Sequence, residues 1–221
     1  MGQFIDFISR PHTSTKRDYL ERVVRGDKAE CATISKRFGF DYFDGDRRYG
    51  YGGYRYDGRW LPVAKAMAEH YGLKPGARIL DIGCGKGFLL HDFLQVVPGA
   101  QVRGIDVSDY AIEHAMDDVK PFLTAGSCTS LPYRDGEFDL VVAINTLHNL
   151  YVYDLVKALK ELQRVRRGPA YLVVDSYRNE QEKANLLHWQ LTCECFFTPD
   201  EWEWLFQLGG YTGDYAFVTF E

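Results

Sequence analysis

The chain has 221 residues, 46% of them hydrophobic, and a formal net charge of −5 at pH 7. This size and apolar content suit one α/β domain with an N-terminal extension, and the acidic balance gives no general attraction to nucleic acid. Residues 1–10 lack the basic start of a secretory signal, and no apolar run approaches the roughly 18 residues of a membrane span, so we expect a cytoplasmic protein with no nucleic-acid or membrane partner.

The first 60 residues are expected to form a helical cap and a lid segment in front of a main domain at residues 61–221. Apolar residues gather at 4–8, and they recur at helical spacing in 18–24 and in 27–38. This pattern favours mostly helical structure. The cap either packs passively on the main domain or closes in part over a substrate pocket.

Residues 41–60 combine aromatic residues, arginines and glycines at high density. The glycines argue against a regular helix or strand, while aromatic faces suit a cation and arginines suit a carboxylate or phosphate. We therefore predict a lid that contacts a bound ligand; the alternatives are a surface loop whose tyrosines pack on the cap and a nucleic-acid-binding segment. The residues concerned are Tyr49, Tyr51, Tyr54, Tyr56 and Trp60, the glycines Gly50, Gly52, Gly53 and Gly58, and the arginines Arg47, Arg48, Arg55 and Arg59.

A helix expected at 61–71 leads to the stretch at 78–90, which reads R-I-L-D-I-G-C-G-K-G-F-L-L. Its apolar start is typical of a buried central strand, and apolar residues at helical spacing follow the glycines. The glycines allow unusual backbone dihedrals and a close approach of a ligand, and the helix start offers that ligand free N–H groups. The stretch therefore predicts a strand, a glycine turn and a helix that bind a ligand.

The glycine spacing is G-x-G-x-G, one residue shorter than the dinucleotide-binding fingerprint, and Asp81 lies two residues before the first glycine. This combination resembles motif I of the class I S-adenosylmethionine (SAM) dependent methyltransferases, within the small-molecule group that includes the ubiquinone and sterol methylating enzymes. The resemblance implies an α/β fold with a Rossmann-like, doubly wound, mostly parallel seven-stranded sheet. It also implies that SAM is held at its amino-acid end by Asp81, Gly83, Cys84, Gly85 and Gly87.

The second expected strand, at 101–106, ends in Asp106. A carboxylate at that strand end can bond both hydroxyls of a ribose. The resemblance makes Asp106 the ribose ligand, with Val107 beside it in the cofactor site. A helix N-cap is the alternative role for Asp106, although Ser108 is the better cap candidate.

Two further strand ends complete the expected site. After a short strand at 121–125, Ser127 stands where the family often has an acid that bonds the adenine, and the backbone N–H of Cys128 can meet the adenine ring. A strand at 138–144 then opens into Asn145, placed beside SAM, and His148, placed beside the methyl acceptor. His148 is either a general base or a residue that orients the acceptor, and a purely structural packing role is the alternative.

For the lid, the resemblance leads us to expect that Tyr49 contacts SAM and that Tyr54 and Arg55 contact the acceptor. The arginines of this segment favour an anionic acceptor.

The C-terminal third is less regular. Helices are expected at 155–165, 179–190 and from Thr198 to about Gly209, with a strand at 170–175. One edge strand is expected at 217–220, and its partner is either very brief or supplied by residues 191–197.

The five cysteines, Cys31, Cys84, Cys128, Cys193 and Cys195, form no C-x-x-C motif. We expect free thiols and no metal site.

The resemblance thus predicts methyl transfer from SAM to an oxygen or nitrogen atom of a small anionic metabolite, such as a sugar nucleotide, a carboxylic acid or a natural-product intermediate. Alternatives are a SAM-binding module without methyl transfer and a methyltransferase for RNA or protein. A homodimer is compatible with the sequence.

Overall fold

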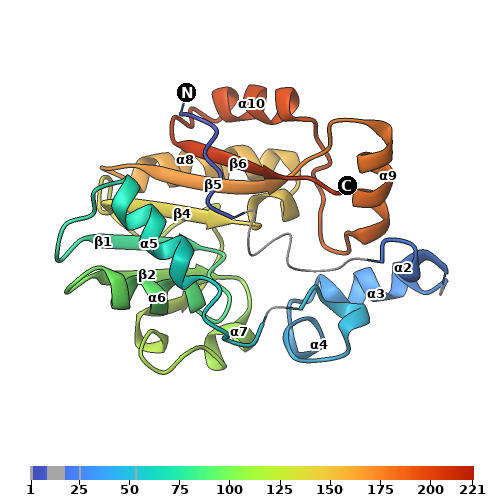
Figure 1. The fold of residues 1–221 in the computed structure, drawn as a ribbon, viewed down its shortest axis with the longest axis horizontal. Helices are drawn as coiled ribbons and strands as arrows, with labels where there is room; N and C mark the ends of the chain where they lie inside the picture. Colours follow the sequence, from blue (N-terminus) through green and yellow to red (C-terminus); the bar gives the residue numbers. More distant parts are fainter. Residues whose placement is uncertain (1, 9–17, 25, 53) are drawn as a thin grey trace.

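The computed structural model describes residues 2–8, 18–24, 26–52 and 54–221. Its centre is a sheet of six parallel strands in the order β3-β2-β1-β4-β5-β6 (Figure 1). The strands are β1 (Arg78–Ile82), β2 (Gln101–Asp106), β3 (Leu123–Ala125), β4 (Leu140–Ile144), β5 (Ala170–Asp175) and β6 (Asp214–Val218). The expected doubly wound α/β class is confirmed, and every strand pair is parallel.

The expected seventh strand is not found in the described part of the chain. The N-terminus occupies the free edge of β6 instead, through a single parallel bridge between Phe4 and Tyr215. The Ile5 amide donates to the Tyr215 carbonyl at 2.9 Å, and the Tyr215 amide donates to the Gln3 carbonyl at 3.0 Å. Residues 4–8 are therefore not helical, although the sequence pattern favours helical structure there. Residues 191–197 form no strand, so they do not supply a partner for the edge strand.

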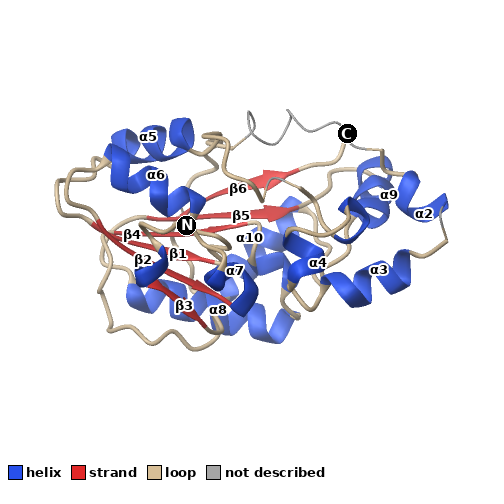
Figure 2. Cartoon of the chain, turned by 90° about the horizontal axis from the view of Figure 1, so that it is seen from below, coloured by secondary structure: helices blue, strands red, loops and turns tan. Residues whose placement is uncertain are grey.

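The central strands are buried on both faces, as their continuous apolar runs indicate. On β1, Ile79 packs with one core cluster and Leu80 with the other. The first cluster lies under α5 (Leu61–His70), α6 (Phe88–Val96) and α9 (Glu180–Trp189). The second lies under α8 (Val152–Val165) and α10 (Pro199–Leu208), so the helices form one layer on each face (Figure 2).

Local sequence fixes several helix ends. Gly87, with φ of 77°, precedes α6, and Thr198 and Glu201 form a complete capping box at the start of α10. The Ser108 side chain caps a short helix after β2, α7 (Asp109–Glu113), and the 3-10 turn η2 (Lys120–Phe122) follows before β3. A second 3-10 turn, η3 (Leu147–Asn149), follows β4.

The cap contains α2 (Glu21–Val24), α3 (Lys28–Ser35), α4 (Phe40–Phe43) and the 3-10 turn η1 (Arg47–Tyr49). These elements lie beyond the carboxyl ends of the strands, near α9 (Figure 2). Gly53, which sequence analysis counts with the lid, is outside the described residues. The division at residue 60 stays a prediction, and Ile8 already belongs to a core cluster of the main sheet.

Among the described residues, no helix has both the length and the apolar character that crossing a bilayer requires.

Candidate functional site

A cavity of about 430 Å³ opens where the carboxyl ends of β1, β2, β4 and β5 meet the cap. This is the edge at which open parallel sheets bind their ligands. The glycine turn, the strand ends, the cap and the segment after α9 form its wall. The charged and polar residues of the wall that carry the argument below are Asp81, Lys86, Asp106, Asn145, His148, Asp175, Gln190 and Thr192.

The glycine turn brings backbone to the cavity wall. Gly83, Gly85 and Gly87 all adopt positive φ angles, of 75°, 52° and 77°. A Cβ on Gly83 would lie 2.0 Å from Oγ1 of Thr146, whose hydroxyl bonds the carbonyls that end β1 and β4. Gly83, Cys84 and Gly85 line the cavity, whereas Gly87 lies behind them at the start of α6.

Asp81 is a buried carboxyl group in the cavity wall that lacks a hydrogen-bond donor among the described residues. It lines the cavity with 5% of its surface exposed, and no described residue donates a hydrogen bond to its side chain. Burial, together with the negative charge of Asp106, raises its pKa to about 7. A cationic group bound beside it would stabilise the ionised form, so the site fits the ammonium end of SAM.

Asp106 lies at the end of β2, one strand away. Its Oδ2 accepts the Gly85 amide at 2.8 Å and its Oδ1 accepts the Ser108 amide at 2.9 Å. Burial nevertheless raises its pKa above the ordinary value. The side chain of Ser108, and not that of Asp106, caps α7. These bonds orient the carboxylate toward the cavity, which Val107 also lines.

The remaining predicted cofactor residues divide into two groups. Cys128 and Asn145 line the cavity, and Asn145 has a positive φ of 54°. Ser127 does not line it; its hydroxyl contacts that of Thr129 at 2.8 Å, while the neighbouring Gly126 takes the place at the wall.

The Tyr/Arg/Gly segment reaches the cavity only in part. Tyr54 lines the wall and packs edge-on against Phe43, with ring centroids 4.9 Å apart. Tyr49 and Arg55, both predicted site residues, do not line it. The Arg48 guanidinium lies 4.6 Å from the centre of the Tyr49 ring, and Arg55 is exposed to solvent at a bend. Arg59 is the arginine that lines the wall, and it forms an ion pair with Asp57.

Charged and polar contacts attach the cap to the glycine turn. Lys86, which lies within that turn, contacts the Asp44 carboxylate at 2.6 Å with 9% of its side chain exposed. The Tyr110 hydroxyl donates to the same carboxylate at 2.7 Å. The cap is thus fixed on the side where SAM is expected.

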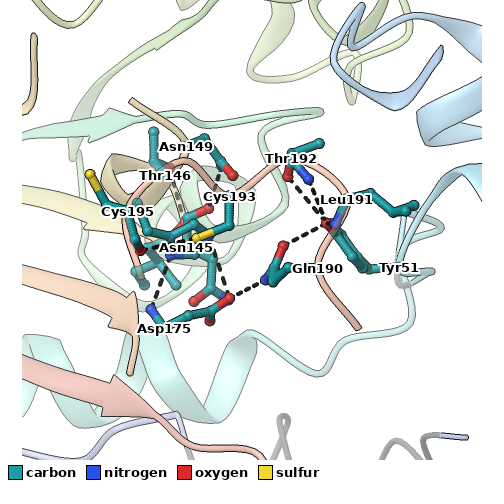
Figure 3. Close-up of polar contacts among 12 residues, drawn as sticks. Tyr51, Asn145, Thr146, Asn149, Asp175, Gln190, Leu191, Thr192, Cys193 and Cys195 are labelled. Carbon is teal, nitrogen blue, oxygen red and sulfur yellow. Dashed lines mark hydrogen bonds and ion pairs between the residues drawn. The ribbon is translucent and has the colours of Figure 1, made fainter. Parts of the chain in front are cut away.

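On the other side, a hydrogen-bond network runs from Tyr51 of the cap through Gln190 to Asp175 (Figure 3). The Tyr51 hydroxyl accepts the amides of Leu191 and Thr192 and donates to Oε1 of Gln190 at 2.6 Å. The side-chain Nε2 of Gln190 donates in turn to Oδ2 of Asp175.

His148 is buried at the end of this network. Its Nδ1 accepts the backbone N–H of Asp175 at 3.0 Å, and its Nε2 lies 3.7 Å from Oδ2 of Asp175. Burial lowers the pKa of His148 below its ordinary value, against the opposing effect of the Asp175 charge. The ring is therefore neutral at pH 7.

Sequence reasoning missed Asp175, Gln190 and Lys86 as wall residues. Asp175 could have been found, because it ends β5 at the same edge as the predicted residues. Lys86 stands inside the glycine turn, a second available signal. Gln190 follows α9, and no pattern in its neighbourhood indicates that it turns back toward β5. The five cysteines form no disulfide with one another, in line with the expected thiols, and all are buried.

Comparison with known proteins gives the family. Residues 73–210 match the family model described as a methyltransferase domain. The chain is similar to sterol 24-C-methyltransferase erg6 of Schizosaccharomyces pombe, with 27% identity over 67% of this chain and 42% of that protein. It is also similar to demethylmenaquinone methyltransferase of Symbiobacterium thermophilum, with 32% identity over 49% of this chain and 45% of that protein. The chain thus spans less than half of the length of either relative.

Solved structures share the fold. The YcgJ protein of Bacillus subtilis superposes with a TM-score of 0.56 at 23% identity, over 66% of each chain. A [4+2]-cyclase, SpnF, superposes with a TM-score of 0.54 at 19% identity, over 86% of this chain and 69% of that one.

Proposed function

The chain belongs to the class I SAM-dependent methyltransferases, and from that premise we propose that it methylates an oxygen or nitrogen atom of a small, anionic metabolite. SAM is the methyl donor of this family, and it supplies an electrophilic methyl carbon on a sulfonium sulfur. The observation that supports this proposal best is Asp81, a buried carboxyl group in the cavity wall with a raised pKa and no donor from the described residues.

We assign the cofactor contacts residue by residue. Asp81 and the turn at Gly83 and Gly85 hold the amino-acid end, and Asp106 holds the ribose. The backbone beside Gly126 and Cys128 meets the adenine, and Asn145 lies at the mouth toward the acceptor. Gly87 shapes the turn without reaching the cavity.

The acceptor fits in the part of the cavity that His148, Asp175, Gln190 and Thr192 line. An anionic acceptor needs a cation there, and Arg59 is the arginine of the wall that can supply one by exchanging its Asp57 partner. Tyr54 contributes an aromatic face. The relatives that act on sterols or demethylmenaquinone support a small-molecule acceptor, while its charge rests on the sequence alone.

The test is a screen with radiolabelled SAM against matched small molecules that carry a hydroxyl, an amine or a carboxylate, each with and without a second anionic group. We expect transfer of the label to a small molecule, with an advantage for the anionic member of each pair. Equal rates for neutral and anionic members would remove the anionic part of the proposal.

A SAM-binding module without methyl transfer is the second candidate, because one protein of this fold is a cyclase. Saturable SAM binding without product, across the screen and with cell extract, would favour it. Label transferred to RNA or protein would instead indicate a macromolecular acceptor. The cytoplasmic location and the homodimer stay predictions.

A further inference from the structure

Asp175 is held at the acceptor part of the cavity by hydrogen bonds to both its backbone and its side chain. Its N–H donates to His148 and its carbonyl accepts Nε1 of Trp202 at 2.9 Å. Its Oδ2 accepts the Gln190 amide, and only 3% of the residue is exposed. The side chain therefore has one orientation, at the end of β5, beside the strand that leads to Asn145 and His148.

The neighbouring imidazole is neutral, but its tautomer leaves it without a lone pair with which to act as a base. The Asp175 amide occupies the lone pair of Nδ1, so a neutral ring carries its proton on Nε2. That N–H faces Oδ2 of Asp175 at 3.7 Å. His148 can donate toward the carboxylate, and it has no free lone pair for the proton of an acceptor.

We propose that Asp175 is the catalytic residue that takes the proton of the methyl acceptor, and that His148 is the positioning residue that holds Asp175. The proposal rests on the function proposed above. The acceptor carries an X–H group, where X is oxygen or nitrogen. Its lone pair forms the bond to the methyl carbon, the carbon–sulfur bond breaks with its electrons on sulfur, and the proton passes to Asp175, later to water.

This chemistry narrows the substrate class. An X–H group can donate to the Asp175 carboxylate, whereas the oxygen of an ionised carboxylate would face a like charge in a buried site. The methylated group is therefore a hydroxyl or an amine, and an anionic group of the same molecule is only a recognition element. The product is an ether or a methylamine and not a methyl ester.

Asp175→Asn tests the role of the carboxylate directly. For compounds of the screen that the wild type methylates, we expect kcat to fall by about 10²–10⁴-fold. SAM affinity, measured by calorimetry, should stay within about threefold of the wild type. Asp154→Asn, at a half-buried position in the first turn of α8, is the control for loss of a carboxylate. Turnover of Asp175→Asn within threefold of the wild type, or methyl esters as the main products, would overturn the proposal.

His148→Asn separates positioning from packing. The shorter side chain keeps an oxygen that can accept the Asp175 amide, but it lacks the Nε2–H that faces the carboxylate. We expect the acidic limb of the kcat profile to move to higher pH, because the carboxylate loses a donor. A lower rate with an unshifted limb means a merely structural histidine and contradicts the positioning role.

A third measurement does not depend on turnover. In protein labelled with ¹⁵N-histidine and bound to S-adenosylhomocysteine, NMR should show His148 neutral at pH 7 with its proton on Nε2. A charged ring, or a proton on Nδ1, would overturn the proposal. If SAM binds but no compound is methylated, the proposed function is contradicted. The tautomer of His148 still tests the proposed role of Asp175 in that case.

Discussion

At the scale of single residues, the site is built on carboxyl groups that the fold has removed from water. Asp81 and Asp106 both have raised pKa values because they are buried at adjacent strand ends. The two differ in their partners, since Asp106 accepts two backbone amides and Asp81 accepts no bond from a described residue. Asp81 therefore gains most from a bound cation, and its protonation should be linked to SAM binding.

The first prediction concerns pH. Without ligand, the pKa of Asp81 is about 7, above the ordinary 3.8, so its stabilising contribution is complete below about pH 4 and is lost as the pH rises to 7. SAM binding should show the opposite trend, weakening by up to about tenfold per pH unit below pH 7. Calorimetry in buffers of different ionisation enthalpy should detect proton release near pH 6.5. Asp81→Asn should bind SAM more weakly and without this pH dependence; an unchanged dependence would exclude Asp81 as its source.

The second prediction concerns Gly83. Gly83→Ala and Gly76→Ala both place an alanine at positive φ, of 75° and 79°, but only the first adds a clash, with Thr146. We expect Gly83→Ala to cost about 1–3 kcal/mol more unfolding free energy than Gly76→Ala, and to weaken SAM binding. Denaturant titration and calorimetry measure the two effects. Equal losses in both variants would mean that backbone strain, and not the Thr146 contact, sets the requirement for glycine.

At the scale of elements, polar contacts attach the cap to the main domain on both sides of the cavity. The Asp44 carboxylate contacts Lys86 in the glycine turn, and the Tyr51 hydroxyl accepts the amides of Leu191 and Thr192 after α9. One attachment lies on the cofactor side and the other on the acceptor side. The cap therefore spans the cavity, and its release is expected to expose both ligands.

The third prediction concerns the first attachment. Asp44→Ala leaves the largely buried Lys86 ammonium without its carboxylate, so we expect a loss of about 1–2 kcal/mol in unfolding free energy and faster SAM release. Stopped-flow displacement of SAM and denaturant titration provide the readings. Asp154→Ala removes an exposed pair within one helix and should change neither. SAM release from Asp44→Ala at the wild-type rate would show that the cap does not control access.

The elements that could be predicted from sequence are those whose signal is local. β2 and β5 have the bounds expected from the sequence, and the Thr198 box starts α10 as expected. The prediction for Phe4–Ile8 was wrong because four apolar residues within five positions can form a helix turn or an edge pair, and only Tyr215, far away in the chain, decides between them. Tyr49 and Arg55 are a similar case, since neither lines the cavity. Composition placed the segment near the ligand, but the direction of each side chain depends on packing.

At the scale of the whole molecule, both ends of the chain meet at one edge of the sheet. The Gln3 amide donates to the side chain of Asp214 at 2.8 Å, across 211 positions of sequence. Tyr171 of β5 donates to the Ile5 carbonyl at 2.9 Å. The N-terminal segment covers an edge that would otherwise present unpaired backbone groups.

The fourth prediction tests this edge. A Cβ on Gly2 would lie 2.1 Å from the Gly213 carbonyl oxygen, whereas one on Gly39 would meet nothing within 4 Å. Gly2→Ala should displace the segment and lower the melting temperature by about 2–4 °C for each kcal/mol lost, while Gly39→Ala should melt close to the wild type. Calorimetric scans compare them. Identical melting of the two variants would mean that the edge pairing adds no stability.

The pairing of Gln3 and Ile5 with Tyr215 also sets the order of events during synthesis. Residues 3–5 leave the ribosome early, but their partners in β6 are translated only after β1 to β5. The cavity wall has the same property, since it includes Ile8 and Phe220. A nascent chain can therefore shape its glycine turn before β6 has been translated, but it completes the cavity wall only once residue 220 has left the ribosome, so SAM meets a complete site late in folding.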